Sequence, residues 1–169
     1  MRRIIVVEYE EQWHTRYEAE RGLLQNTLGK VISQVHHIGS TSIPGLSAKP
    51  IIDILLEVYD LDELDKLNFA MERAGYCVRG ENGIPNRRYF TKGEEHRSHH
   101  VHAFGVGNPQ IVKHLAFRDY LRKNKKEADE YAEIKHAAAL ASEDNIPLYS
   151  TLKADFIAHH LRLALRDYK

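Results

Sequence analysis

Residues 37–58, HIGSTSIPGLSAKPIIDILLEV, place a segment rich in Gly, Ser and Pro between two apolar runs. The second run, Ile51 to Val58, is apolar apart from Asp53 and Glu57, a pattern typical of a central strand. Burying an unpaired carboxylate costs on the order of several kcal/mol. A lone acid inside such a strand therefore indicates a functional site, and the Gly-Ser loop before it has to be interpreted together with the acid.

Gly39 and Ser40 end the first apolar run, where a strand would turn into a loop. Glycine lets backbone N–H groups approach a phosphate closely, and the serine hydroxyl adds a donor. An acid on the following strand can hold a divalent cation that bridges the phosphates. The arrangement is similar to that of the nucleotidyltransferase superfamily, where Gly-Ser, a spacer of about ten residues and an acid-x-acid pair follow one another. Residues 41–52 form a suitable spacer here. We predict that the phosphate-binding residues of this loop are Gly39, Ser40, Thr41 and Ser42.

The second acid of that pair is missing. Side chains alternate along a strand, so the partner of Asp53 should stand at position 55, which is Leu55. Glu57 shares the face of Asp53, but four residues of strand separate the two by roughly 13 Å. A single ion cannot bridge that distance, because its ligands lie about 2 to 2.5 Å from it. A standard two-metal site therefore cannot be assembled from this strand alone.

A histidine cluster offers a replacement. In the run HHVHAF, His100 and His102 alternate onto one strand face. If this strand neighbours the strand of Asp53, two imidazoles and one carboxylate converge, a set that suits zinc, manganese or iron better than magnesium. We predict Asp53, His100 and His102 as metal ligands and as catalytic residues, with a divalent ion (Mg, Mn or Zn) as the expected cofactor. The alternative is that the histidines bind phosphate or form a polar face near the sheet edge.

Basic residues gather beside these motifs. Lys49 could reach a phosphate from the loop, with a solvated loop lysine as the alternative. Arg87 and Arg88 begin a strand next to the histidines, and alternation points one of them toward the cleft, where a guanidinium can bind phosphate. We predict Lys49 and Arg88 as phosphate-binding residues. The alternative for the arginines is a solvated sheet edge.

The periodicity of the chain predicts one domain, residues 1–169, of the α+β class. Helices are expected over 11–28 and 61–74 and strands over 31–38, 51–58 and 76–79, followed by a hairpin that turns near 93–97. Residues 1–108 would form an α/β core in which helices pack on a mixed sheet. Residues 109–169 would form a mainly helical C-terminal extension.

Composition narrows the classes of partner. Lysine and arginine together number 24, as do aspartate and glutamate, and this balance argues against a nucleic-acid partner. No apolar run approaches the length of a membrane span, and no secretory signal is recognised, so we expect no membrane partner. Cys77 is the only cysteine and can form no internal disulfide, which fits the cytoplasm. The expected partner is a small phosphate-bearing ligand, while the oligomeric state stays open.

Several longer segments resemble the signature of the GrpB-like family of small bacterial proteins. They are HIGSTSIPGLSAKPIID, GENGIPNRRYFTKG, RSHHVHAF, HLAFRDYLR and YSTLKADFI, and together they cover nearly the whole chain in order. The resemblance implies a nucleotidyltransferase-like fold, with Gly39 and Ser40 at the phosphate-binding turn and Asp53 as the first metal-binding acid. Leu55 departs from the superfamily pattern, and no acid stands at His100 to His102, where the third acid is expected. Related domains fused to dephospho-coenzyme A kinase imply a nucleotide or coenzyme A context.

Three functions are compatible with these residues. The first is a metal-dependent nucleotidyl or phosphoryl transferase with a remodelled site, in which His100 or His102 acts as ligand or general base. The second is a catalytically inactive nucleotide-binding module that keeps the phosphate-binding turn. The third is a structural metal-binding protein built on the histidines, which leaves the Gly-Ser loop unexplained.

Overall fold

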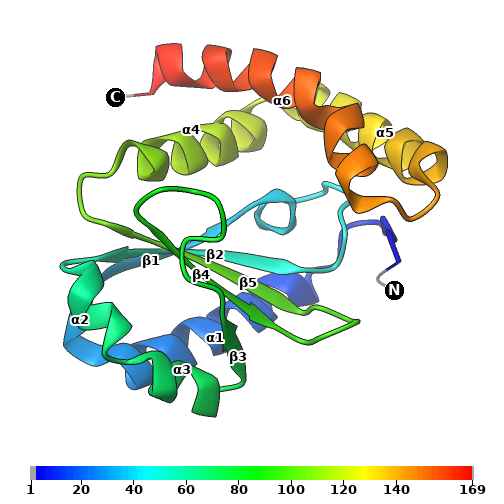
Figure 1. The fold of residues 1–169 in the computed structure, drawn as a ribbon. Helices are drawn as coiled ribbons and strands as arrows, with labels where there is room; N and C mark the ends of the chain where they lie inside the picture. The colour runs from blue at the N-terminus through cyan, green and yellow to red at the C-terminus, as the bar shows by residue number, and fades with distance from the viewer. Residues whose placement is uncertain (1–2, 169) are drawn as a thin grey trace.

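The computed structural model of the protein describes residues 3–168 (Figure 1). Within this range one mixed sheet has the strand order β1-β2-β5-β4-β3, and only the central pair β2–β5 is parallel. The chain reaches the parallel neighbour by a long crossover, which contains the strands β3 and β4. The strands are β1 (Ile32–Ile38), β2 (Ile52–Val58), β3 (Tyr76–Val78), β4 (Arg87–Lys92) and β5 (His99–Gly105).

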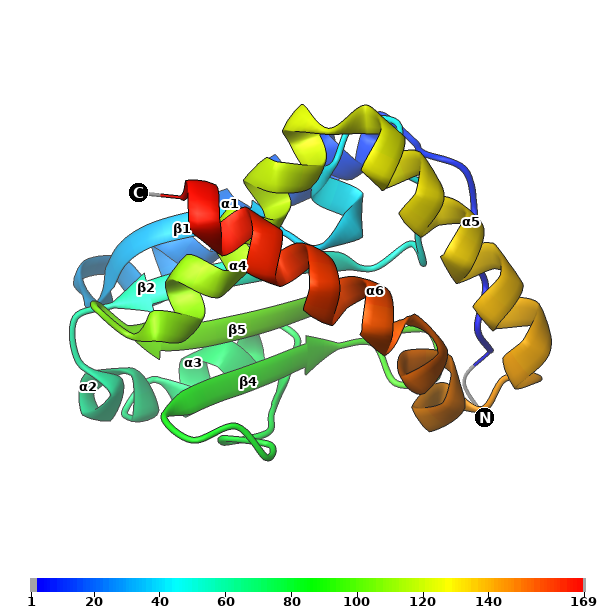
Figure 2. The ribbon, with the colours of Figure 1, turned by 90° about the horizontal axis from the view of Figure 1, so that it is seen from above.

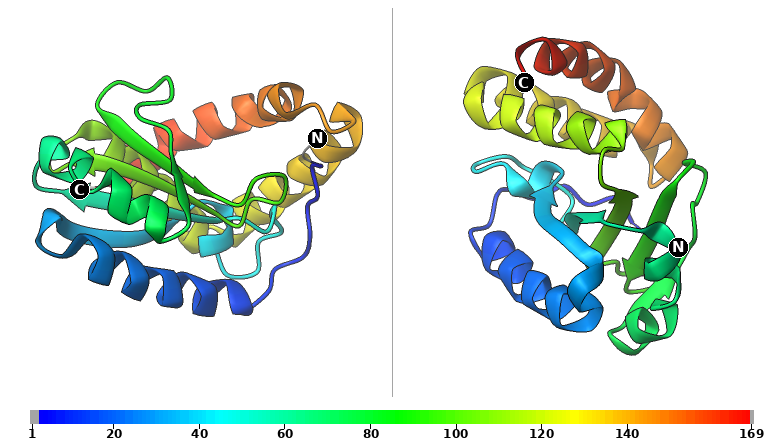
Figure 3. Two further views of the ribbon diagram at one scale, coloured as in Figure 1. Left: turned by 60° about the horizontal axis from the view of Figure 1, so that its bottom comes forward. Right: turned by 90° about the vertical axis from the view of Figure 1, so that its left-hand side faces the viewer.

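Helices cover both faces of this sheet, so the molecule has three layers (Figure 3). One face carries α1 (Gln12–Leu28), α2 (Leu61–Asp65) and α3 (Asn68–Arg73). The other carries α4 (Pro109–Lys123), α5 (Lys125–Ser142) and α6 (Ile146–Asp167), and Figure 2 shows α6 running above β4 and β5. The mixed α+β class and the helical extension predicted from the sequence are therefore confirmed. No helix in the described range is long and apolar enough to cross a membrane.

Burial on both faces explains the apolar run of β2. Ile52, Ile54 and Leu56 join the core formed with α1, α2 and α3, whereas Leu55 packs on the opposite face. The α1 helix buries Trp13 and other residues that recur at helical spacing toward the first core. Central strands covered by helices read as continuous apolar runs, so Asp53 and Glu57 are the exceptions that the sequence indicated.

One predicted element is wrong in detail. The helix expected over 61–74 is two short helices, α2 and α3, because Leu67 leaves helical geometry with φ −103° and ψ 13°. The N–H of Leu67 donates to the carbonyl of Leu64 at 2.9 Å, a tighter turn than that of an α-helix. Leu64 and Leu67 both contact the core, so burying both side chains sets the bend.

The C-terminal helices hold the Gly-Ser loop against the sheet. Ile43 and Leu46 from this loop share a core with Leu121 of α4, Tyr131 of α5 and Phe156 of α6. Asn108 and Asn145 cap α4 and α6 with their side-chain oxygens, and a proline follows each cap. The loop is therefore a packed layer between the sheet and the helical extension.

Candidate functional site

The Gly39 turn is shaped by its contact with Asp53. Gly39 has φ +72°, and a Cβ atom placed on it would lie 2.7 Å from Oδ2 of Asp53. Residues that carry a Cβ rarely adopt this backbone conformation, and here the side chain would also meet a carboxylate. The next three residues form the 3₁₀ turn η2 (Ser40–Ser42). Glycine at position 39 thus allows the turn to lie directly against the acid.

Two of the predicted hydroxyl groups are used inside this turn. The Thr41 hydroxyl donates to the carbonyl of Ile51 at 3.3 Å and lies 3.0 Å from Nε2 of His37. The Ser42 hydroxyl donates to the carbonyl of Gly39. Phosphate binding by Thr41 and Ser42 stays a prediction, and their observed contacts stabilise the shape of the loop.

Asp53 and the two histidines lie on one face of neighbouring strands. In the register of β2 and β5, Asp53 stands opposite His100, and His102 is two residues further along β5. Nδ1 of His100 lies 3.5 Å and Nε2 of His102 lies 3.3 Å from the same oxygen, Oδ1 of Asp53. Burial raises the pKa of the Asp53 carboxyl, but the interactions with His100 and His102 outweigh it and hold the pKa well below its ordinary value. Asp53 is therefore an ionised carboxylate in contact with two imidazoles.

Metal ligation by these three residues stays a prediction. Their proximity is what a shared ion would need, since metal ligands lie about 2 to 2.2 Å from zinc. Among residues 3–168, however, no group of three or more His, Cys, Asp or Glu side chains has the geometry to hold a metal ion.

A cavity of about 130 Å³ opens beside Asp53, and we call it the Asp53 cavity. Three lysines line it, from the loop before β2, from α5 and from α6, against a single carboxylate. The helical extension therefore supplies part of a site whose other part belongs to the sheet. The lining residues are Ser40, Thr41, Ala48, Lys49, Ile51, Asp53, His100, Lys135, Tyr149 and Lys153.

Lys135 is the most unusual group in this cavity. Its residue is only 2 % exposed, and its Nζ lies 4.7 Å from the centre of the Tyr131 ring. Burial, together with the charges of Lys153 and Lys49, lowers the pKa of Lys135 to about 6. Burial and the charge of Lys49 also lower the pKa of Lys153, to about 8. Like charges are concentrated here without a matching number of acids.

Several buried polar atoms at this cavity lack a partner in the described part of the chain. Nζ of Lys135, the Tyr149 hydroxyl and Nε2 of His100 are all buried without a hydrogen bond there. Unsatisfied buried polar atoms are rare in folded proteins because each costs on the order of 1–3 kcal/mol. These three atoms belong to residues that line one and the same cavity.

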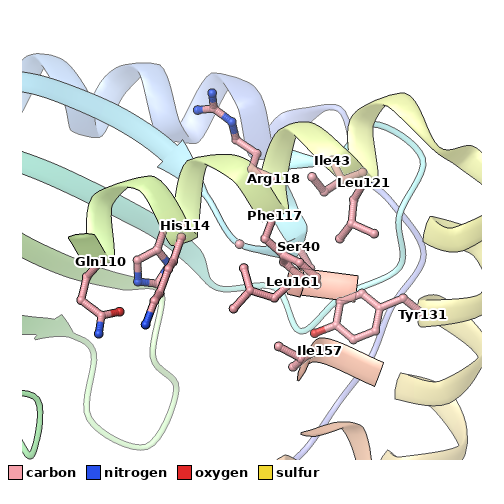
Figure 4. Close-up of a pocket in the computed structure, with 12 residues that line it drawn as sticks. Ser40, Ile43, Gln110, His114, Phe117, Arg118, Leu121, Tyr131, Ile157 and Leu161 are labelled. Atoms are coloured by element: carbon pink, nitrogen blue, oxygen red, sulfur yellow. The ribbon is translucent and has the colours of Figure 1, made fainter. Parts of the chain in front are cut away.

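A second cavity, which we call the apolar cavity, adjoins the first at Ser40 and has a volume of about 220 Å³ (Figure 4). Its walls come from the Gly-Ser loop and from α4, α5 and α6. Figure 4 shows Phe117, Ile157 and Leu161 around its middle and Gln110 and His114 toward one end. The lining residues are Gly39, Ser40, Ile43, Gln110, Lys113, His114, Phe117, Arg118, Leu121, Tyr131, Ile157 and Leu161.

The structure does not bring Arg88 to either cavity. Arg88 lies on the opposite face of β4 and pairs with both carboxylate oxygens of Asp65, at 2.7 and 3.1 Å. Its neighbour Arg87 faces the site instead, with Nη1 3.4 Å from Nδ1 of His102. Which arginine faces the site depends on the register of β4, and a one-residue difference reverses the side.

Sequence reasoning missed Lys135 and Lys153. A signal for the first was available, because Lys135 lies at helical spacing with Ala128, Tyr131 and Ala138, the buried residues of α5. Lysine is almost never fully buried unless it is paired, so a lysine on the apolar face of a helix indicates a polar site near its amine. The same signal was available for Lys153, which lies at helical spacing with Tyr149 and Phe156, two buried residues of α6.

Comparison with known proteins places the chain in a family. A family model described as GrpB protein matches residues 3–163. The chain belongs to the GrpB family. It is 44 % identical over 156 residues to the UPF0157 protein YqkA of Bacillus subtilis, covering 92 % of this chain and 46 % of that relative, so it spans about half of YqkA. The crystal structure of the conserved protein GrpB from Enterococcus faecalis has a TM-score of 0.92 at 43 % identity, over 96 % of this chain and 98 % of the other.

More distant likenesses place the GrpB fold among nucleotidyltransferase folds. The structure of Cid1 in complex with its short product ApU matches with a TM-score of 0.55 and 12 % identity, over 79 % of this chain and 42 % of Cid1. At this identity the likeness shows the fold, which is nucleotidyltransferase-like. In sequence, the chain is also 27 % identical over 169 residues to dephospho-CoA kinase of Mycobacterium leprae, covering 83 % of this chain and 41 % of that protein.

Proposed function

We propose that the protein binds a small phosphate-bearing ligand, a nucleotide or a coenzyme A-related compound, with its phosphates in the Asp53 cavity. The observation that carries this proposal is the buried amine of Lys135, which has no hydrogen-bond partner in the described part of the chain. Burial and the neighbouring lysines lower its pKa to about 6, and a bound phosphate would supply the negative charge that lets this amine take up a proton.

The surroundings of Lys135 favour an anion over a cation. Lys49 and Lys153 line the same cavity, so positive side chains outnumber the single carboxylate of Asp53. His100 and His102 both contact that carboxylate through ring nitrogens. The positive charge of the lysines is therefore left for a ligand, and the Ser40 hydroxyl lies at the same cavity as an additional donor.

The apolar cavity gives this ligand a second part. It meets the Asp53 cavity at Ser40, and its walls include Phe117, Ile157 and Leu161. A phosphate ester with an apolar or ring-shaped group could place that group there while its phosphates face the lysines. The nucleotidyltransferase-like fold and the similarity to dephospho-CoA kinase support nucleotides and coenzyme A-related compounds as the classes to test.

A second candidate is metal-dependent transfer of a nucleotidyl or phosphoryl group. It is favoured by the approach of His100 and His102 to one oxygen of Asp53, the position of the first superfamily acid. In that case the three residues would hold the ion, which would supply charge stabilisation to the phosphates.

Thermal unfolding with a panel of ligands tests the first proposal. Inorganic triphosphate, ATP and coenzyme A are each added to the wild type, to Lys135→Met and to Lys126→Met, an exposed lysine on the same helix that serves as control. A ligand at one hundred times its Kd stabilises by about 2.7 kcal/mol, which raises the Tm of a chain of this size by roughly 5–10 °C. We expect this rise in the wild type and in Lys126→Met and its loss in Lys135→Met. No rise with any ligand, or an equal rise in Lys135→Met, contradicts the proposal.

The same assay separates the two candidates when Mg²⁺, Mn²⁺ or Zn²⁺ is added. Ligand binding that requires the metal and disappears in Asp53→Ala would support transfer chemistry. Ligand binding without metal that is unchanged in Asp53→Ala would exclude the metal-dependent reaction and leave the binding function.

A further inference from the structure

His102 has a partner at each of its ring nitrogens. Nε2 lies 3.3 Å from Oδ1 of Asp53, and Nδ1 lies 3.4 Å from Nη1 of Arg87. Arg87 is itself held in place, since it donates from Nε to the carbonyl of Glu81 at 3.1 Å and from Nη2 to the carbonyl of Asn82 at 2.9 Å. Its guanidinium also lies over the Tyr89 ring, 4.5 Å from the centroid. Arg87 is therefore fixed by groups other than the imidazole of His102.

The chemistry of these neighbours decides where the imidazole proton is. A guanidinium has only donors, and a carboxylate has only acceptors. Nδ1 of His102 can interact favourably with Arg87 only through its lone pair, so it carries no proton. The proton of the neutral ring is then on Nε2, where it donates to Asp53.

In this arrangement the ring proton of His102 lies on the nitrogen that faces Asp53, which is the reverse of the arrangement that supports metal binding. A histidine that ligates a metal through one nitrogen almost always donates its other N–H to a carboxylate, a carbonyl or a water. If an ion took Nε2 of His102, the ring proton would move to Nδ1 and point at an N–H of Arg87. Two donors would then face each other inside a largely buried site.

We propose that Arg87 is a positioning residue that fixes His102 as an Nε2–H donor to Asp53 and keeps His102 out of metal coordination. Asp53 is thereby held at a set orientation by a hydrogen bond from its own chain. The inference concerns the Asp53–His102–Arg87 contact alone and stands whether or not phosphate binds in the Asp53 cavity. It also leaves Asp53 and His100 without a third ligand from this group.

Nitrogen NMR of the histidine rings tests the tautomer directly. Protein labelled with ¹⁵N at histidine is measured at pH 8, above the ordinary histidine pKa, and the His102 signals are assigned by their loss in His102→Gln. We expect His102 as the Nε2–H tautomer in the wild type and in Arg87→Lys, which keeps a donor at this position. In Arg87→Met we expect the Nδ1–H form to appear. An Nδ1–H or doubly protonated His102 in the wild type overturns the proposal.

Titration with Zn²⁺ alone, read at the same ring nitrogens, tests the metal consequence without interference from surface histidines. In the wild type the His102 signals should stay unchanged. In Arg87→Gln, whose amide oxygen can accept from Nδ1–H, Zn²⁺ should bind at His102 about 10–100-fold more tightly, the usual effect of an outer-shell partner. Zn²⁺ on His102 in the wild type, or equal affinity in both proteins, contradicts the proposal. If Arg87→Gln does not fold, the wild-type spectra alone decide.

Discussion

Glu20 and Asp53 are two carboxylates that lie near β5 on opposite faces of the sheet, each with a histidine and a lysine nearby. Glu20, on α1, accepts from the Tyr76 hydroxyl at 2.6 Å, pairs with Lys92 and lies 3.7 Å from Nε2 of His99. Asp53 contacts imidazoles, while the lysines on its side surround a cavity.

The two acids differ in where the lysine side chains lie relative to the carboxylate. Burial raises the pKa of Glu20, but the hydrogen bonds from Lys92 and Tyr76 outweigh it and lower the pKa below its ordinary value. The acid and its counter-charge are therefore in direct contact, and no cavity separates them. Around Asp53 the amine of Lys135 is buried without a hydrogen bond within residues 3–168. We infer that the Glu20 network stabilises the fold, whereas the Asp53 side gives up stability for a ligand.

Glu20→Ala tests the structural role that we assign to the Glu20 network. Of all the predicted changes, we expect this one to have the largest effect. The substitution leaves Lys92 and the Tyr76 hydroxyl without their shared acceptor, and removing one partner of a buried pair costs about 3 kcal/mol. Urea denaturation should show this loss of unfolding free energy. Glu18→Ala, an exposed acid on the same helix, should change it by less than about 0.5 kcal/mol. Equal stability of the two variants would contradict a structural role for Glu20.

Lys135→Met should change stability in the opposite direction. It removes a buried ammonium that lacks a partner in the described chain and keeps a side chain of similar length, so the unfolding free energy should rise by about 1–2 kcal/mol. The pKa of Lys135 is about 6 in the folded protein, against an ordinary 10.5. The folded state therefore binds fewer protons between these values, and wild-type stability rises with pH across this range.

Because of that slope, the gain in Lys135→Met should be largest below about pH 6, where the lysine is charged in both states, and should shrink as the pH increases above this value. Urea denaturation at several pH values measures it, with Lys126→Met as the matched control. A loss of stability in Lys135→Met would show that Lys135 is a structural partner like Lys92.

The pH dependence of anion binding is the smallest effect that we predict. The charged groups facing Lys135 are Lys49, Lys153 and Asp53, and Asp53 stays ionised because its pKa is lowered. Above about pH 6 Lys135 must take up a proton when an anion binds, and above about pH 8 so must Lys153. Affinity should fall by at most about tenfold per pH unit for each lysine that is reprotonated.

Calorimetry with sulfate, an anion that does not titrate in this range, measures both the affinity and the proton uptake. In Lys135→Met the fall in sulfate affinity that begins near pH 6, and the proton uptake that accompanies it, should be absent. Constant sulfate affinity between pH 6 and 9 in the wild type would contradict the assignment of Lys135 to the anion site.

Local sequence signals predicted the sheet and half of the candidate site. The alternation of His100 and His102 and the acid inside an apolar strand are properties of single strands, and they indicated the residues that meet in space. The parallel pairing of β2 and β5 needs a crossover, and no local pattern specifies which strands a crossover joins.

The other half of the site depends on how distant segments pack. Lys135 and Lys153 reach the Asp53 cavity only because α5 and α6 fold back over the sheet, and helix periodicity gives no docking direction. The choice between Arg87 and Arg88 depends on strand parity, which changes with a one-residue difference in register. Lysines on the buried faces of α5 and α6, Lys135 and Lys153, were the available clues to the missing half.

The division of the Asp53 cavity between sheet and helical extension also has a consequence for biosynthesis. The turn at Ser40 and the acid at Asp53 leave the ribosome before Lys135 and Lys153. A nascent chain can thus pair its strands and surround its acid with imidazoles before the lysines of α5 and α6 are present. Competence to hold an anion would be gained only once α6 has been synthesised and packs over the sheet.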